Sequence, residues 1–229
     1  MQLTLKRYQT CAEPQNDMVG KITCVCDEFS YSFSNGTYFL TGEVDSGAWS
    51  FADSLICADN KISQYTSYEE IALNGKNVDL SEVQKMSFSI GQYKTYGEKK
   101  FESILKHALK KSKSTYTVED ICKKFDFFGI DEWLKNQKMS LVNTKIWYLS
   151  AAIGLAMGKK IFVFPWLSNR TFRLYHGFII NTIHILNQED LLVFVPCSDK
   201  ADFPTGEKYN VVRMNSLYQV DFDNFISAT

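Results

Sequence analysis

The amino-acid sequence predicts an α/β protein with a mostly parallel sheet at its core and a helical lobe inserted into it. Two short runs, 161–164 (IFVF) and 191–196 (LLVFVP), are continuously apolar, which is typical of strands buried on both faces of a parallel sheet. Helix candidates stand before and between these runs, at 145–158 and 171–186. Because strands and helices alternate, the strands are expected to run parallel with helices packed on the sheet.

Strand patterns dominate the N-terminal part of the chain. Segment 22–33 is rich in β-forming residues and is followed by an Asn-Gly turn signal at Asn35. The TYFL stretch that comes next predicts a short buried strand, and a helix candidate follows at 49–57. Late in the chain, 209–214 predicts one more strand.

Between the two halves lies a compact series of short elements. Segment 69–83 predicts a strand, a second Asn-Gly turn at Asn74, and a helix that begins near Asp79 or Ser81. In segment 85–92 every second residue is apolar, which predicts a half-buried strand.

From about residue 100 the apolar positions recur with the period of a helix. Segment 101–109 has apolar residues on one side and lysines on the other, so it predicts an amphipathic helix. Thr117 then caps a second helix whose first turn is acidic, which extends a small helical lobe over 100–138. The lysine run at 106–111 is interpreted as a solvated face, with contact to a membrane protein or to lipid head groups as the alternative.

Composition limits the classes of partner. The chain has 25 lysine and arginine residues against 26 aspartate and glutamate residues, so its overall charge recruits neither nucleic acid nor an anionic membrane. The N-terminal segment lacks an apolar signal core, and no apolar run approaches the ~18 residues of a membrane helix. Six scattered cysteines form neither a disulfide framework nor a zinc pattern. These features predict a reduced, soluble, cytoplasmic protein.

Segment 38–55, YFLTGEVDSGAWSFADSL, has the order strand, glycine loop and helix in which proteins hold nucleotide phosphates. This segment and its neighbours resemble the ATP-binding cassette (ABC) ATPase domain in order and spacing, over nearly the whole chain. The matching segments run up to the phosphate loop, up to the Q-loop, and through the signature motif to the Walker B strand: 29–47, 71–92 and 139–168. The resemblance implies a P-loop NTPase-like α/β fold with an antiparallel β subdomain. It also implies a single domain over 1–229, with the helical lobe at about 95–142.

The resemblance carries the family's nucleotide-binding positions onto residues of the phosphate loop, the Q-loop and the signature motif. It implies that these positions are vestigial; they are Gly42, Ser46, Gly47, Ser50, Gln92 and Ser140. The loop and the start of the following helix are candidates for holding an anion through backbone N–H groups and the helix dipole. The favoured interpretation is that this loop only packs, with Trp49 filling the space of the lysine and the nucleotide.

The residues that would perform ATP hydrolysis in the family are replaced. The phosphate-loop lysine is Ala48, and Trp49 stands where a hydroxyl would coordinate Mg²⁺. After the Walker B strand, Pro165 and Trp166 occupy the positions of the metal-binding aspartate and the glutamate that activates water, and Cys197 falls near the switch histidine. The sequence therefore predicts no catalytic residue, no metal site and no cofactor, with Mg-ATP as the one ligand left open.

The resemblance implies a degenerate ABC transporter ATP-binding subunit that does not hydrolyse ATP. Such a subunit would be a structural or regulatory partner, in a dimer with a competent ATPase subunit or with a second copy of itself. It would dock on a transmembrane permease and be peripheral on the cytoplasmic face of the cell membrane. No nucleic-acid partner is expected.

Two other functions remain open. One is an active P-loop-type NTPase in which Lys159, Lys160 or Arg173 supplies the missing charge. The other is a stand-alone scaffolding protein without a transporter partner.

Three side chains have both a functional and a structural interpretation. His176 and His184 lie eight residues apart on one predicted helix and suggest metal binding, but no third ligand is evident, so they are interpreted as ordinary surface histidines. Cys197 is interpreted as a buried thiol rather than as a nucleophile paired with a histidine.

Overall fold

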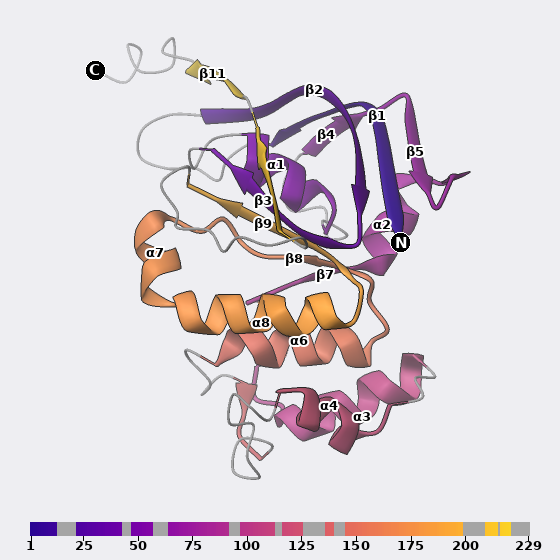
Figure 1. The fold of residues 1–229 in the computed structure, drawn as a ribbon, viewed down its shortest axis with the longest axis vertical. Coiled ribbons are helices and arrows are strands. Elements are labelled where there is room, and N and C mark those ends of the chain that lie inside the picture. Colours follow the sequence, from indigo (N-terminus) through magenta and orange to yellow (C-terminus); the bar gives the residue numbers. More distant parts are fainter. Residues whose placement is uncertain are drawn as a thin grey trace.

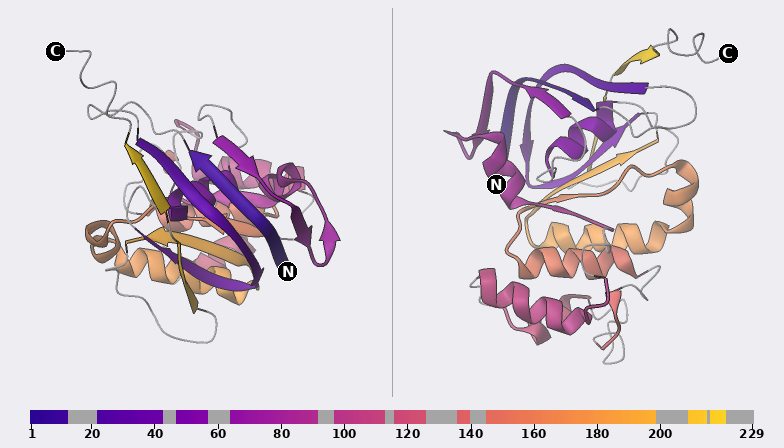
Figure 2. Two further views of the ribbon diagram at one scale, coloured as in Figure 1. Left: turned by 90° about the horizontal axis from the view of Figure 1, so that it is seen from above. Right: turned by 180° about the vertical axis from the view of Figure 1, so that it is seen from behind.

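The structure is a computed structural model that describes residues 1–12, 22–42, 47–56, 64–91, 97–112, 116–125, 136–139, 145–198, 209–214 and 216–220. Its elements form layers: an antiparallel sheet, a parallel sheet, and helices on the far side of the parallel sheet (Figure 1). Helix α1, Gly47–Ser54, lies between the two sheets. Helices α6, Ile146–Ala156, and α8, His176–Gln188, cover the opposite face of the parallel sheet, as a second view also shows (Figure 2).

The parallel sheet carries the strands that flank the predicted nucleotide site. Its strand order is β10-β3-β9-β8-β7, and all its neighbouring pairs are parallel. Its strands are β3 Gly36–Thr41, β7 Ser87–Ser89, β8 Ile161–Val163, β9 Leu192–Cys197 and β10 Tyr209–Arg213. The prediction of a parallel sheet built on the two apolar runs is confirmed.

Side chains of the parallel sheet alternate between two hydrophobic cores, as the pleat of a strand requires. In β3, Tyr38 and Leu40 face α1 and the antiparallel sheet, whereas Phe39 faces the helices. In β9, Phe194 belongs to the first core and Val193 to the second. Both faces are therefore buried, which is why these strands are apolar at consecutive positions.

The antiparallel sheet has the order β11-β2-β1-β5-β6, and β4 also pairs with β1. Its strands are β1 Gln2–Ala12, β2 Ile22–Ser34, β4 Gln64–Ser67, β5 Glu70–Leu73, β6 Lys76–Asn77 and β11 Ser216–Val220. Strands β5 and β6 are joined by the predicted Asn-Gly turn, in which Asn74 and Gly75 have φ of 51° and 78°. Positive φ at both central residues is the requirement of a type I′ hairpin turn.

The helical layer confirms the helix predictions for the middle of the chain. Helix α6 is buried at every position, because the sheet lies on one side of it and helices α3, Phe101–Ser112, and α4, Val118–Phe125, lie on the other (Figure 1). The start of α4 is fixed by reciprocal capping. The Thr117 hydroxyl accepts from the Asp120 N–H at 3.1 Å, and the Asp120 carboxylate accepts from the Thr117 N–H at 2.8 Å.

Three predicted elements differ in the structure. Segment 171–186 forms two helices, α7, Asn169–Leu174, and α8, because Tyr175 breaks the helical conformation with φ of −111° and ψ of 16°. The half-buried strand is limited to β7, since Met86 ends helix α2, Leu80–Met86, and the Ser87 hydroxyl donates to the carbonyl of Val83 in that helix at 2.8 Å. Helix α1 begins two residues earlier than predicted and ends before 57.

The packing of α6 on the sheet makes a testable prediction. A Cβ atom on Gly154 would lie 2.5 Å from Cε1 of Phe162 and 2.9 Å from Cδ1 of Phe88, both packed in the core between the sheet and the helices. We expect Gly154→Ala to lower the free energy of unfolding by about 1–3 kcal/mol through overpacking. Urea denaturation followed by circular dichroism measures the change.

Gly177→Ala is the matched control, because Gly177 is also helical and nothing lies within 4 Å of the position that a Cβ atom would take there. This substitution is expected to be neutral or to stabilise by up to about 1 kcal/mol. Equal effects of the two substitutions would show that the contact between α6 and β8 is looser than described.

Candidate functional site

The carboxyl ends of β3, β8 and β9 lie at one edge of the parallel sheet, and Gly42, one of the predicted nucleotide-site positions that the structure describes, lies there. The N–H of Gly42, which follows β3, donates to the carbonyl of Cys197 at 3.0 Å. Leu167, which follows β8, pairs with Cys197 as an isolated parallel bridge, and its N–H donates to the Pro196 carbonyl at 2.9 Å. Ligands of parallel α/β sheets bind at this edge, so the end of β9 stands between the two segments that would form a nucleotide site.

Of the phosphate-loop candidates, Gly42, Gly47 and Ser50 lie within the described residues. Gly42 ends the strand side of the loop and Gly47 begins α1, and both are buried. Residues 43–46, and with them Ser46, lie outside the described residues.

The first turn of α1 presents no cation. Ala48, at the position of the lysine, is fully buried and belongs to the hydrophobic core between the two sheets. Ser50 is also fully buried, and its hydroxyl donates to the carbonyl of Gly47 at 3.2 Å, whereas Trp49 is half-buried. The one charged residue of α1 is Asp53, and burial raises the pKa of its carboxyl group. What remains for an anion is the partial positive charge of the helix N-terminus.

The segment after β8 lacks the groups that metal-assisted hydrolysis needs. Phe164 continues the sheet, since its N–H donates to the Phe194 carbonyl at 2.9 Å. Pro165 is exposed, and Trp166 is half-buried with its Nε1 enclosed and without an acceptor in the part of the chain that the structure describes. Neither side chain can coordinate Mg²⁺ or take a proton from water.

Cys197 is fully buried at the end of β9. The chain has three histidines, and all of them are exposed, so none is buried with the Cys197 thiol; they are His107, His176 and His184. A nucleophilic thiol needs access and an electropositive neighbour, and the geometry favours a packing role.

The start of the Q-loop is anchored on helix α6. Gly91 has φ of +81°, its N–H donates to the hydroxyl of Ser150 at 2.9 Å, and a Cβ atom there would lie 3.3 Å from the ring of Trp147. The Ser150 hydroxyl in turn donates to the Ile146 carbonyl at 2.7 Å. Sequence reasoning missed this anchor, although a lone serine within an apolar helix is a signal for it. Two candidates, Gln92 and Ser140, lie outside the described residues.

The cations considered for an unorthodox NTPase lie at different edges of the sheet. Lys159 and Lys160 precede β8, whereas the phosphate loop follows β3, so in a parallel sheet they stand at the opposite edge. The Lys159 amine donates to the carbonyl of Lys85 there. Arg173 lies on α7, beyond the carboxyl end of β8, and lines an open pocket of about 440 Å³.

His176 and His184 lie on one helix, α8, as predicted, and both side chains are exposed. The Nε2 atom of His184 is 3.0 Å from Nε2 of Gln188. Within the described ranges, no group of three or more His, Cys, Asp or Glu side chains is placed to hold a metal ion. The same part of the chain contains no helix that is both long and apolar enough to cross a bilayer.

No protein-family model and no curated protein sequence matches this chain. Solved structures do match it. A protein assigned as an ABC transporter ATP-binding protein from Pyrococcus furiosus is 11% identical, with a TM-score of 0.61 over 92% of this chain and 97% of that chain. CbiO1 from Clostridium perfringens, part of the ABC transporter complex CbiONQ, is 13% identical, with a TM-score of 0.58 over 99% of this chain and 91% of that chain.

Identities this low establish a shared fold and leave the activity to be argued from the site. The similarity spans both sheets and the helical layer, because it covers almost the full length of each chain. This chain therefore has the fold of ABC transporter ATP-binding proteins.

Proposed function

We propose that this protein is a degenerate ABC transporter ATP-binding subunit that retains the scaffold and has lost ATP hydrolysis. The observation that carries the proposal is the replacement of the reacting groups at one preserved edge of the sheet. The N–H of Gly42 donates to the Cys197 carbonyl and Leu167 pairs with Cys197, so backbone bonds tie together the segments that follow β3, β8 and β9. The side chains on that framework are the buried methyl group of Ala48 and the ring of Pro165 where charge is required.

The expected loss in the rate of ATP hydrolysis is large enough to support the absence of turnover. Phosphoryl transfer is catalysed almost entirely by positioning and by charge, through a lysine, a metal ion and a group that orients water. Removing one preorganised donor commonly costs ~10²–10³ in rate. Here the lysine, the metal ligands and the base are replaced together.

A subunit that does not hydrolyse ATP acts through the proteins to which it binds. We propose that the single domain 1–229, with a helical lobe at about 95–142, pairs with a competent ATPase subunit or with a second copy of itself. We further propose that the pair docks on a transmembrane permease at the cytoplasmic face of the membrane. Support comes from the fold shared with CbiO1, which is part of an ABC transporter complex.

A second candidate function keeps hydrolysis and uses Arg173. This side chain is exposed on α7, at the same edge of the sheet as the phosphate loop, and it neighbours Arg170 in an open pocket. An arginine can stabilise transition-state charge in phosphoryl transfer. The proposal of a vacant site is preferred because no metal ligand or base accompanies this arginine among the replaced positions.

Nucleotide binding is the first test. At 100 times its dissociation constant, a ligand stabilises a native site by ~2.7 kcal/mol. For a chain of this size that corresponds to a rise in melting temperature of about 5 to 10 °C. We expect Mg-ATP to give no saturable rise, measured by differential scanning fluorimetry up to millimolar concentration.

A competent ABC ATPase subunit serves as the positive control in the same assay. A saturable rise for this protein would contradict the vacant site. Phosphate release that disappears in Arg173→Ala but persists in the neighbouring Arg170→Ala would establish the second candidate instead.

The second test restores a lysine at position 48, where the resemblance places the phosphate-loop lysine. Since Ala48 is fully buried among apolar side chains, Ala48→Lys places an unpaired charge in the core. We expect a loss of about 3 kcal/mol or more in the free energy of unfolding, measured by denaturant titration.

Ala48→Met is the matched control for length, with an expected cost of about 1–3 kcal/mol from overpacking alone. The difference between the two variants isolates the charge. A lysine variant as stable as the methionine variant, with new binding of Mg-ATP, would mean that an open phosphate pocket persists.

The partner distinguishes a transporter subunit from a stand-alone scaffold. We expect a permease encoded beside the gene to copurify with this chain in stoichiometric amount when the two are coexpressed. A chain that purifies alone under the same conditions would favour the scaffolding alternative.

A further inference from the structure

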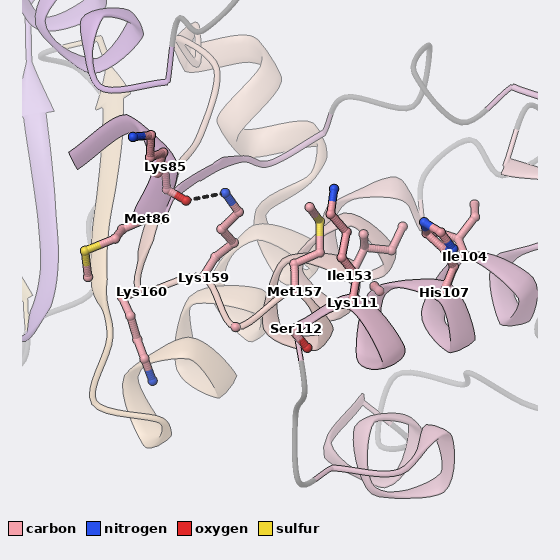
Figure 3. Close-up of a pocket in the computed structure, with 12 residues that line it drawn as sticks. Lys85, Met86, Ile104, His107, Lys111, Ser112, Ile153, Met157, Lys159 and Lys160 are labelled. Atoms are coloured by element: carbon pink, nitrogen blue, oxygen red, sulfur yellow. Dashed lines mark hydrogen bonds between the residues drawn. The ribbon is translucent and has the colours of Figure 1, made fainter. Parts of the chain in front are cut away.

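A second pocket lies at the opposite edge of the parallel sheet from the candidate nucleotide site. It has a volume of about 750 Å³, within the range of about 300–1,000 Å³ that is usual for small-molecule sites. Its walls come from the end of α2, from one face of α3, and from the end of α6 with the turn into β8 (Figure 3). It goes beyond the proposed function, since none of the nucleotide-site positions that the structure describes lines it.

One wall of the pocket is apolar. Ile104 and Ala108 contribute from α3, and Ile153 and Met157 contribute from the end of α6. Ile104, Ala108 and Ile153 belong to the core between the sheet and the helical layer, and Met157 packs against it. A ligand with an apolar part can therefore extend the hydrophobic core from outside.

The rim of the pocket is cationic. Figure 3 shows the amines of Lys111 and Lys159 directed to the same side of the pocket, while the amine of Lys160 points away. His107 stands on the α3 side. Of the described residues that line the pocket, none is an aspartate or a glutamate. Burial, and then repulsion from Lys111, lowers the pKa of the Lys159 amine, and no carboxylate stands beside the two amines among the described lining residues.

Lysines near helix C-termini often serve only to bond the last carbonyls. At the end of α6 that need is already met. The Ile153, Gly154 and Leu155 carbonyls accept from the N–H groups of the following turn at 2.9–3.0 Å. The Ala156 carbonyl accepts from the Ser112 hydroxyl at 2.7 Å. Lys159 donates to the Lys85 carbonyl with one of its three protons, and no described residue makes a hydrogen bond or an ion pair with the Lys111 amine.

We propose that this pocket binds an amphiphilic anion, with a phosphate or carboxylate group held by Lys111 and Lys159 and an apolar tail against the exposed parts of Ile104, Ala108 and Met157. The anion relieves the repulsion between the two amines, and the tail removes apolar surface from water. A bound ligand contacts α3 of the helical layer and the turn that enters β8, and so links the helical layer to the sheet.

Isothermal titration calorimetry with octyl phosphate as the probe tests the proposal. We expect saturable binding with one molecule per chain. Inorganic phosphate and 1-octanol, which each present half of the ligand, are expected to bind at least about tenfold more weakly, because each loses one of the two interactions. Inorganic phosphate that binds as tightly as octyl phosphate would overturn the role of the apolar wall. 1-Octanol that binds as tightly would overturn the role of the lysines.

Variants place the binding at this pocket. Lys111→Gln and Lys159→Gln are each expected to weaken octyl phosphate by about tenfold or more. Lys111 is exposed, so its variant is expected to keep the melting temperature of the wild type even where Lys159→Gln does not. Lys110→Gln is the matched control, since Lys110 is exposed on the same helix and does not line the pocket. Equal affinity of the wild type and Lys111→Gln would overturn the proposal.

The natural source of the anion is either a membrane lipid or a soluble amphiphile. Cosedimentation with phosphatidylcholine vesicles that contain phosphatidic acid, lost in Lys111→Gln and not seen with phosphatidylcholine alone, assigns the ligand to a lipid. Calorimetric binding of octyl phosphate without cosedimentation assigns it to a soluble amphiphile. The absence of both signals overturns the proposal.

Discussion

The backbone pairing of β9 with β3 on one side and β8 on the other is the interaction on which the rest of the structure depends. The pairing of β9 with β3 joins segments that are more than 100 residues apart in sequence, such as Tyr38 with Phe194, and the pairing of β9 with β8 aligns Val163 with the same Phe194. Both faces of these strands are buried, so the ladder is dry and its hydrogen bonds cannot be exchanged for water. The same ladder sets the edge at which the phosphate loop and the end of β8 meet.

This constraint makes the fold independent of the side chains that would perform chemistry at the site. The convergence of Gly42, Cys197 and Leu167 is made by backbone N–H and carbonyl groups, and the packing is made by apolar side chains such as Phe51 and Phe194. In a nucleotide site, the charged side chains that contact the phosphates take part in phosphoryl transfer, and they are not part of this backbone framework. Substitution of a charged side chain at that edge therefore leaves the bonds of this framework in place.

Sequence patterns predicted the elements whose environment is uniform and missed those whose environment changes along the strand. The parallel strands and α6 are apolar throughout because every side of them is buried. Strand β1 was not predicted, since its buried positions shift from Leu3 and Leu5 to Tyr8 and Thr10. The register shift there coincides with Arg7, whose φ of 48° interrupts the alternation. Likewise, the residues at the positions that the resemblance assigns to catalysis can be read from the sequence, whereas the bond between Gly91 and Ser150 depends on tertiary contact.

The two edges of the parallel sheet differ in what they offer a ligand. At the carboxyl edge, the positions that the resemblance assigns to charged groups hold a buried methyl group, a proline and an indole, and the cations on that side are Arg170 and Arg173 in an open pocket on α7. At the opposite edge two lysine amines flank an apolar wall with no carboxylate among the described lining residues. Lys159 illustrates the difference, because its proximity to Walker B in sequence suggested a catalytic cation, while the direction of β8 places it on the far side. Position along a parallel strand, and not distance in sequence, decides which site a charge serves.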